Sequence, residues 1–154
     1  MSDMAETPVA PLVLAPDDGI RYTARGSEML FKAVAATTDG AFSLMDRTLP
    51  PGGRMPPAHR HDGNAEAYLV TEGEVTFVLE GETTVGGAGT FALVPAGAGH
   101  TFGNTSDAPA RVLVLHAPAL DGYFAELEAL WSGTEPPSPA DERALMSRHG
   151  MRPA

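Results

Sequence analysis

Two histidines and a glutamate near the middle of the chain have the residue types and the spacing of metal ligands. His59 and His61 stand two positions apart in the run GRMPPAHRHDGNAEAYLVTEG, which covers residues 53–73. In an extended strand, side chains at i and i+2 point to the same face, so both imidazoles can meet one ion. Glu66 follows a short Asp-Gly-Asn turn and can add a carboxylate.

A third histidine follows in the run GTFALVPAGAGHTFGN, residues 89–104, where His100 comes directly after a tight loop over 95–99. The loop is placed to aim one more imidazole inward. Three imidazoles and a carboxylate suit iron, nickel, manganese, copper, cobalt or zinc better than calcium or magnesium. The chain has no cysteine, so it has no thiolate ligand. We expect one divalent transition metal per chain (Fe, Ni, Mn, Cu or Zn), and affinity order alone does not choose among these.

The chemistry of such a site follows from its open positions. A six-coordinate ion with four protein ligands keeps two positions for substrate and dioxygen, or for substrate and water. Metal binding needs neutral imidazoles, so the affinity is expected to fall below about pH 6. Glu66 has two candidate roles, as a ligand and as a catalytic general base on the substrate. The sequence leaves both open.

Strand alternation selects the side chains that share a face with these ligands. His116 lies on a predicted strand, and a place in the pocket wall suits it better than a place as a fifth ligand. Arg47, Asp46 and Arg111 could touch the substrate, but the solvated surface of the barrel, the usual place for a charged side chain, is the default expectation. Phe42 and Phe91 are expected to face the pocket or the core. The predicted pocket-lining residues are Met55, Tyr68, Val70, Phe102 and His116.

The elements around these residues are predicted to be short strands. With 17 glycines and 14 prolines in 154 residues, breakers are frequent, which favours many turns. Hairpin signals such as Glu72-Gly73 and Glu80-Gly81 separate the runs. Many closely spaced short strands are typical of a sandwich or barrel. The predicted strands are 20–24, 29–35, 41–49, 66–72, 74–80, 82–86, 90–94, 100–104 and 110–117.

Two helices are predicted to close the chain. Residues 121–131 place apolar side chains at helical spacing. Ser138 has the character of an N-cap, Pro139 stands at the first helical position, and Gly150 stands where a C-cap is expected.

The charge and the hydrophobic pattern of the chain limit the kinds of partner that it can bind. A net charge of −10 argues against nucleic acid, which requires a basic face. The apolar run over 10–15 is short and contains a proline, so neither a membrane span nor a signal peptide is expected. We expect a cytoplasmic protein that contacts a small-molecule substrate and neither nucleic acid nor membrane.

Both runs resemble the two motifs of the cupin superfamily. The first motif is Gly, five residues, His-x-His, three or four residues, Glu, six residues, Gly; the second is Gly, five residues, Pro-x-Gly, two residues, His, three residues, Asn. Every spacing is met here, by Gly53, His59, His61, Glu66 and Gly73, and by Gly89, Pro95, Gly97, His100 and Asn104. The end of the chain also resembles single-domain bacterial cupins that are loosely quercetin-dioxygenase-like, in Gly122-Tyr123-Phe124 and Arg148-His149-Gly150.

The resemblance implies an all-β fold, the cupin-type small β-barrel (double-stranded β-helix or jelly roll), followed by two short C-terminal helices. The expected organisation is a flexible lead-in over 1–18, the barrel over 19–118 and a helical extension over 119–154. His59, His61, Glu66 and His100 are then the metal ligands. A homodimer is expected by analogy with cupins, and because cyclic dimers are the commonest oligomers.

Three functions remain open at this stage. The first is a metal-dependent dioxygenase acting on a small organic molecule, aromatic or flavonol-like, with dioxygen as co-substrate. The second is a redox-neutral metal enzyme, an isomerase or a cyclase of polyketide type. The third is a non-catalytic cupin that binds or senses a small molecule. We rank them in this order. All three remain open because fold alone does not fix function.

Overall fold

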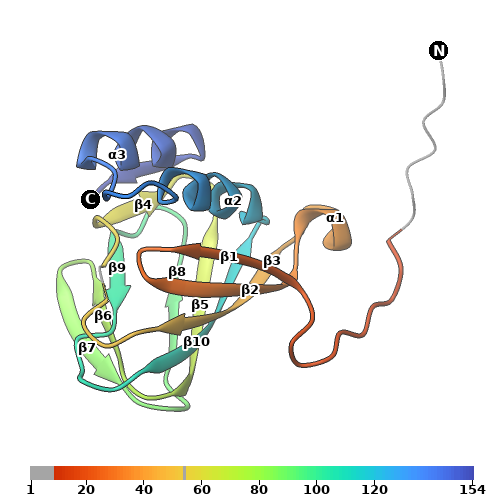
Figure 1. The fold of residues 1–154 in the computed structure, drawn as a ribbon, viewed down its shortest axis with the longest axis horizontal. Helices are drawn as coiled ribbons and strands as arrows, with labels where there is room; N and C mark the ends of the chain where they lie inside the picture. Colours follow the sequence, from red (N-terminus) through yellow and green to blue (C-terminus); the bar gives the residue numbers. More distant parts are fainter. Residues whose placement is uncertain (1–8, 54) are drawn as a thin grey trace.

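A computed structural model describes residues 9–53 and 55–154 and places their strands in two antiparallel sheets (Figure 1). The larger sheet contains, in spatial order, β1 (Ile20–Ala24), β2 (Ser27–Ala33), β3 (Ser43–Leu49), β10 (Ala110–Ala117), β5 (Ala65–Glu72) and β8 (Phe91–Val94). The smaller sheet contains β11 (Met151–Pro153), β4 (His59–His61), β9 (His100–Gly103), β6 (Val75–Leu79) and β7 (Glu82–Gly86).

The hydrophobic core lies between the two sheets. On β10, alternation buries Val112, Val114 and His116 and turns the residues between them outward. The smaller sheet contributes Val75 and Phe77 from β6 to the core, and both are fully buried. The two inner faces therefore form one packed interior, and any polar group inside it requires a partner.

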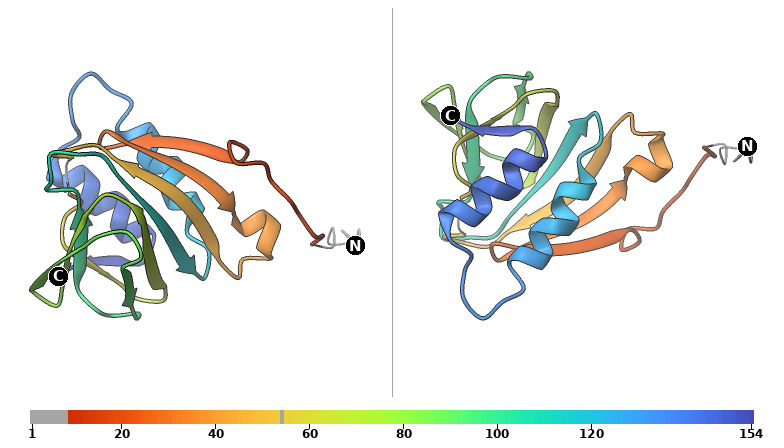
Figure 2. Two further views of the ribbon diagram at one scale, coloured as in Figure 1. Left: turned by 90° about the horizontal axis from the view of Figure 1, so that it is seen from below. Right: turned by 90° about the horizontal axis from the view of Figure 1, so that it is seen from above.

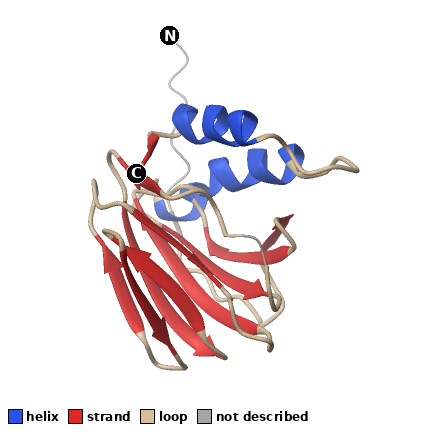
Figure 3. Cartoon of the chain, turned by 90° about the vertical axis from the view of Figure 1, so that its left-hand side faces the viewer, coloured by secondary structure: helices blue, strands red, loops and turns tan. Residues whose placement is uncertain are grey.

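Helices gather at one end of this two-sheet body (Figure 3). They are the single turn α1 (Ala35–Thr38), α2 (Asp121–Leu130) and α3 (Pro139–Arg148). In α2, Phe124 and Leu127 are buried, and Phe124 packs against Phe31 of β2. Figure 2 shows α2 and α3 side by side across this end. No helix among the described residues has the length and apolar character that crossing a membrane requires.

The predicted fold class is confirmed, with two antiparallel sheets and two C-terminal helices after the last long strand. The beginning of α3 matches its prediction closely. The Ser138 hydroxyl accepts a hydrogen bond from the backbone N–H of Asp141 at 3.1 Å, and Pro139 is the first helical residue. A side-chain cap depends on a few neighbouring residues, so the start of this helix could be predicted from the sequence.

Three elements depart from the sequence predictions. The strand predicted over 29–35 ends at Ala33, because residues 35–38 form α1. Residues 151–153 form β11, which pairs with β4 through the registers Met151↔His61 and Pro153↔His59. No local signal announced that strand, since three residues hold no periodicity.

Two phenylalanines were wrongly placed. Phe91 is 63% exposed and Phe42 is 37% exposed. Alternation along the edge strand β8 buries Ala92 and Val94, which turns Phe91 outward. Leu93 on β8 and Leu69 on β5 are exposed on the same side of the sheet, and Leu69 is the register partner of Phe91. We call Leu69, Phe91 and Leu93 the outer apolar face.

The segment before β1 runs along the larger sheet. The Lys32 ammonium of β2 donates to the carbonyls of Ala15, Pro16 and Asp18 at 3.0, 2.6 and 2.7 Å. Residues 1–8 of the predicted lead-in lie outside the described residues.

Candidate metal centre

The predicted ligands come together from three strands. His59 and His61 lie on β4, His100 on β9 and Glu66 on β5. One ligand atom from each lies within 4.8 Å of the others, and all four side chains are buried. His59 and His100 are register partners in the smaller sheet, while Glu66 reaches in from the larger one. The cluster therefore sits between the two inner faces.

Two backbone carbonyls set the tautomers of two histidines. Nδ1 of His59 lies 2.8 Å from the Pro57 carbonyl, and Nδ1 of His100 lies 3.0 Å from the Ala98 carbonyl. A carbonyl only accepts, so in each case Nδ1 carries the proton and donates it. In the neutral ring this leaves a lone pair on Nε2, the form in which an imidazole binds a metal.

Glu66 is the centre of the cluster. Its Oε2 lies 3.0 Å from His61 Nε2 and 2.8 Å from His100 Nε2. Its Oε1 lies 3.1 Å from His116 Nε2 and accepts a 2.5 Å hydrogen bond from the Tyr68 hydroxyl. Burial raises the pKa of Glu66, but His116, His100 and His61 more than offset it and hold that pKa well below the usual value. Glu66 is thus a carboxylate.

The imidazoles differ in proton affinity. Burial, and then the neighbouring His100, lower the pKa of His59 from 6.5 to about 4. Burial also lowers the pKa of His100, but its hydrogen bond to Glu66 outweighs that effect and raises the pKa. Protons therefore compete less with a metal at His59 than at His100.

One further observation fits a metal. Within the described residues, Nδ1 of His61 and Nδ1 of His116 are buried with no hydrogen-bond partner. Buried polar atoms without a partner are uncommon in finished structures and point to a water or an ion. Three imidazoles and a carboxylate, buried and converging, suit a transition metal, and these four residues fit a cupin metal site.

A small cavity of about 20 Å³ adjoins the cluster. His59, His61, Glu66 and His116 line it on one side. Phe102, Phe124 and two arginines, Arg25 and Arg47, are among its other lining residues. In this conformation the cavity has room for about one water molecule.

The other predicted pocket residues have different surroundings. Tyr68 and Val70 are each 1% exposed, and Tyr68 bonds Glu66 rather than facing open space. The Met55 side chain packs on the backbone of β9, where a Cβ added to Gly103 would lie 2.4 Å from Met55 Cγ. Phe102 and His116 belong to the cavity lining.

Arg47 was wrongly assigned to the surface, and Arg25 was missed. Arg47 is 3% exposed because it occupies the same inward face of β3 as Met45 and Leu49. That alternation is visible in the sequence and was the available signal. Arg25 lies in the turn between β1 and β2 with a φ of 52°, and its side chain enters the interior.

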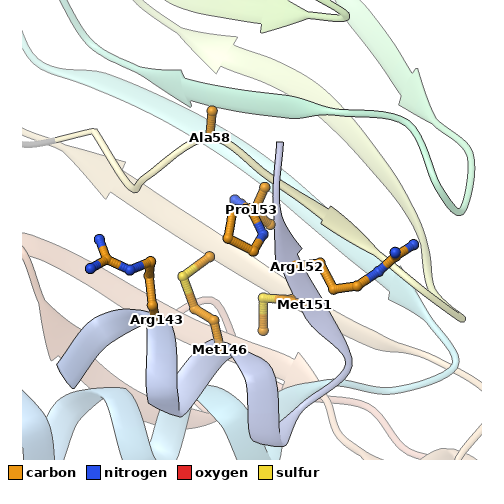
Figure 4. Close-up of a pocket in the computed structure, with 7 residues that line it drawn as sticks. Ala58, Arg143, Met146, Met151, Arg152 and Pro153 are labelled. Carbon is orange, nitrogen blue, oxygen red and sulfur yellow. The ribbon is translucent and has the colours of Figure 1, made fainter. Parts of the chain in front are cut away.

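A second cavity, shown in Figure 4, also has His59 in its lining. Arg143 and Met146 from α3 and Met151 from β11 line it, together with Ala58. Its volume is about 20 Å³. His59 and Met151 also line the cavity beside the cluster, so the two cavities adjoin.

Comparison with known proteins agrees with this geometry. Residues 45–116 match the family described as the cupin domain. The chain is 28% identical over 137 residues to a quercetin 2,3-dioxygenase of Bacillus subtilis (strain 168). That match covers 86% of this chain and 40% of the relative, so the chain spans less than half the relative's length.

Two solved structures share the architecture. A sugar phosphate isomerase of the cupin superfamily from Silicibacter pomeroyi DSS-3 is 29% identical, with a TM-score of 0.59, covering 69% of this chain and 75% of that one. The polyketide cyclase RemF from Streptomyces resistomycificus has a TM-score of 0.61 at 22% identity, covering 70% and 80%, which shows a common fold. On its motifs, its two-sheet fold and these matches, the chain contains a domain of the cupin superfamily.

Proposed function

We propose that this chain is a metal-dependent cupin enzyme, and specifically a dioxygenase that acts on a small organic molecule such as an aromatic enol. The observation that carries the proposal is the buried set of four donors within 4.8 Å of one another. The relationship to a quercetin 2,3-dioxygenase supports the choice of reaction. His59, His61, Glu66 and His100 would hold the metal, and a redox-active ion there would supply substrate polarisation and electron transfer.

The chain's own residues divide the remaining work. Glu66 is ionised and carries the negative charge in the cluster, so it would serve as the carboxylate ligand or, in its other candidate role, as the group that accepts a proton from a substrate hydroxyl. Its Oε1 is held by Tyr68 and His116, which fixes the carboxylate in one orientation. Phe102 and Phe124 give the cavity apolar walls that exclude water from that proton transfer.

Metal content and oxygen uptake test this proposal together. Protein purified without a metal-binding tag should contain about one iron, nickel, manganese or copper per chain. The double variant His59→Ala, His61→Ala should lose it, whereas His149→Ala, outside the cluster, should keep it. Oxygen consumption with a panel of flavonols and related enols should follow the metal. No uptake with iron, nickel and manganese each loaded would exclude the dioxygenase.

A redox-neutral enzyme, an isomerase or a polyketide-type cyclase, is the second candidate. It is favoured by the 29% identity to a sugar phosphate isomerase and by the fold shared with a polyketide cyclase. Zinc as the resident metal, with turnover in the absence of oxygen, would select it. Tight binding of one metabolite without turnover would instead select the third candidate, a binding or sensing cupin.

A homodimer and a cytoplasmic location belong to the same proposal. Sedimentation velocity at micromolar concentration checks the first, and fractionation of the source cells checks the second. A monomer throughout the concentration range would remove the dimer.

A further inference from the structure

A buried arginine faces the candidate metal centre without a counter-ion. Arg47 is 3% exposed, and its Nε donates to the Ser27 hydroxyl at 2.7 Å. Its guanidinium carbon lies 5.2 Å from the ring centroid of Phe102. Among residues 9–53 and 55–154, no carboxylate oxygen lies within 4.0 Å of its guanidinium, and neither Nη1 nor Nη2 has a protein acceptor.

A second cation lies beside this cavity and has a carboxylate partner of its own. Arg25 lines the same cavity, and its Nε donates to Glu142 Oε1 at 3.2 Å. Glu142 therefore offsets the charge of Arg25, and it also accepts a hydrogen bond from Trp131 Nε1 at 3.0 Å. Burial and the neighbouring Arg25 lower the pKa of Arg47 to about 10, so Arg47 still carries its proton at neutral pH.

The nearest carboxylate facing the cavity does not complete the balance. Glu66 lines the cavity but is already engaged by three imidazoles and Tyr68. A divalent ion bound there would add further positive charge. A cation that is buried without a partner is costly, and proteins retain one where a ligand supplies the missing anion.

The chemistry of the missing partner follows from the guanidinium. A planar fork of N–H donors matches two oxygens of a carboxylate or phosphate and binds them bidentately. Arg47 lines the cavity that His59, His61 and Glu66 also line, and only its Nε has an acceptor among the described residues. A ligand held by Arg47 would thus present its remaining part to the metal ligands.

We propose that Arg47, flanked by Arg25, binds an anionic oxygen group of the substrate and thereby orients it toward the metal centre. That the anion is the substrate rests on the proposed function; that the site binds anions does not. Since the cavity has a volume of about 20 Å³, the lining side chains of α2 and β11 must move to admit the ligand. Trp131, the single tryptophan of the chain, bonds Glu142 of α3 and so reports that movement by its fluorescence.

Calorimetric titration of the metal-loaded protein tests the proposal. Potassium phosphate and potassium malonate are titrated separately, and malonamide serves as the uncharged counterpart of malonate. We expect at least one anion to bind and malonamide not to bind. Arg47→Gln should lower the affinity for the anion at least about tenfold. The affinity of Arg47→Lys should lie between those of Arg47→Gln and the wild type. Binding of phosphate alone or malonate alone identifies the class of the group.

Arg111→Gln is the matched control, because Arg111 lies on β10 with its side chain 45% exposed. It should bind the anion as the wild type does. Equal affinity in Arg47→Gln and wild type, equal binding of malonamide, or no binding of either anion up to about 10 mM would overturn the proposal. If Arg47→Gln does not fold, Arg47→Lys carries the comparison, with Trp131 fluorescence as a second readout.

The outcomes separate this inference from the proposed function. Anion binding that depends on Arg47, without oxygen uptake or other turnover, keeps the inference and removes the enzyme. Turnover of uncharged compounds that Arg47→Gln leaves unchanged keeps the enzyme and removes the inference.

Discussion

Glu66 connects the two kinds of residue at the site, the metal ligands and the side chains around them. One of its oxygens faces His61 and His100, and the other faces His116 and Tyr68. Three of these partners are imidazoles and one is a phenol hydroxyl, so removal of the hydroxyl tests the orientation of Glu66 without removing a metal ligand.

Removal of the Tyr68 hydroxyl should weaken metal binding without abolishing it. Tyr68→Phe takes away the 2.5 Å hydrogen bond that orients Glu66 Oε1 and leaves the four ligands in place. Partners of this kind typically contribute 10–100-fold in affinity, so we expect a loss of about tenfold. Competition with a chelating dye measures it. Tyr22→Phe on β1, remote from the cluster, should bind as the wild type does, and an unchanged affinity in Tyr68→Phe would contradict the role assigned to the hydroxyl.

The stability of the metal-free protein should fall as the pH falls from 6.5 toward 4. The unfolded chain protonates His59 near pH 6.5, whereas burial and His100 hold its pKa in the folded protein at about 4. Between these values the unfolded state binds the extra proton, which costs the fold about 2 kcal/mol by pH 5.

Urea unfolding at pH 7 and pH 5, in the presence of a chelator, measures this effect. His59→Gln should show a smaller loss between the two pH values than the wild type shows. His149→Gln, whose histidine pairs with Glu126 outside the cluster, should keep the wild-type loss. The same loss in His59→Gln and wild type would assign the pH dependence to other groups.

For individual residues, the sequence predicted those that stand in short local motifs. It missed those that come into contact only through long-range folding. His59, His61, Glu66 and His100 stand in two short motifs, and the structure brings all four within 4.8 Å. Arg25 reaches Glu142, which is 117 positions away in the chain, and no local pattern predicts that pair.

At the scale of elements, tight turns join strands that carry the candidate ligands or pair with them. The turn between β5 and β6 contains Gly73 with a φ of 69°, and the hairpin between β6 and β7 contains Gly81 with a φ of 80°. Both are left-handed conformations that glycine adopts most easily. They differ in their surroundings, since a Cβ on Gly73 would lie 2.4 Å from the Pro109 carbonyl oxygen and one on Gly81 would meet nothing within 4 Å.

Gly73→Ala should therefore destabilise the protein more than Gly81→Ala. Gly81→Ala introduces only the strain of its backbone conformation, about 1 kcal/mol. Gly73→Ala adds a clash with backbone atoms that cannot move aside cheaply, and we expect a total of at least about 3 kcal/mol. Thermal and urea unfolding give both values. Equal losses would mean that the chain near Pro109 shifts freely.

Element boundaries were predictable where capping or turn residues mark them. Ser138 and Pro139 mark the beginning of α3, and residue pairs that end in glycine, such as Glu80-Gly81, mark the turns. In contrast, β11 forms by pairing with β4, and this pairing joins segments that are far apart in the sequence. Its three residues have no pattern that would predict a strand on their own.

At the scale of the whole molecule, the core and the metal cluster are separate sources of stability. The interior packs Val112, Val114 and Phe77 between the sheets with no contribution from an ion. Removal of the metal leaves Glu66 with its imidazole and hydroxyl partners, so no bare charge remains buried.

Chelation should accordingly lower the melting temperature and leave the fold intact. The far-ultraviolet circular dichroism spectrum of the metal-free protein should match that of the loaded protein. Its unfolding should stay cooperative, and added metal should raise the melting temperature with concentration as binding linkage requires. A spectrum that loses its β signal on chelation would show that the ion is part of the structure.

The outer apolar face has a consequence for how the protein behaves in concentrated solution. Phe91 and Leu93 lie on an edge strand, where unpaired backbone groups and exposed apolar side chains invite contact between molecules. A net charge of −10 opposes that contact by repulsion at neutral pH. Near the isoelectric point of about 4.7 this repulsion vanishes, and high salt screens it at any pH. Turbidity should therefore rise in acidic or saline buffers, and Phe91→Lys should suppress it.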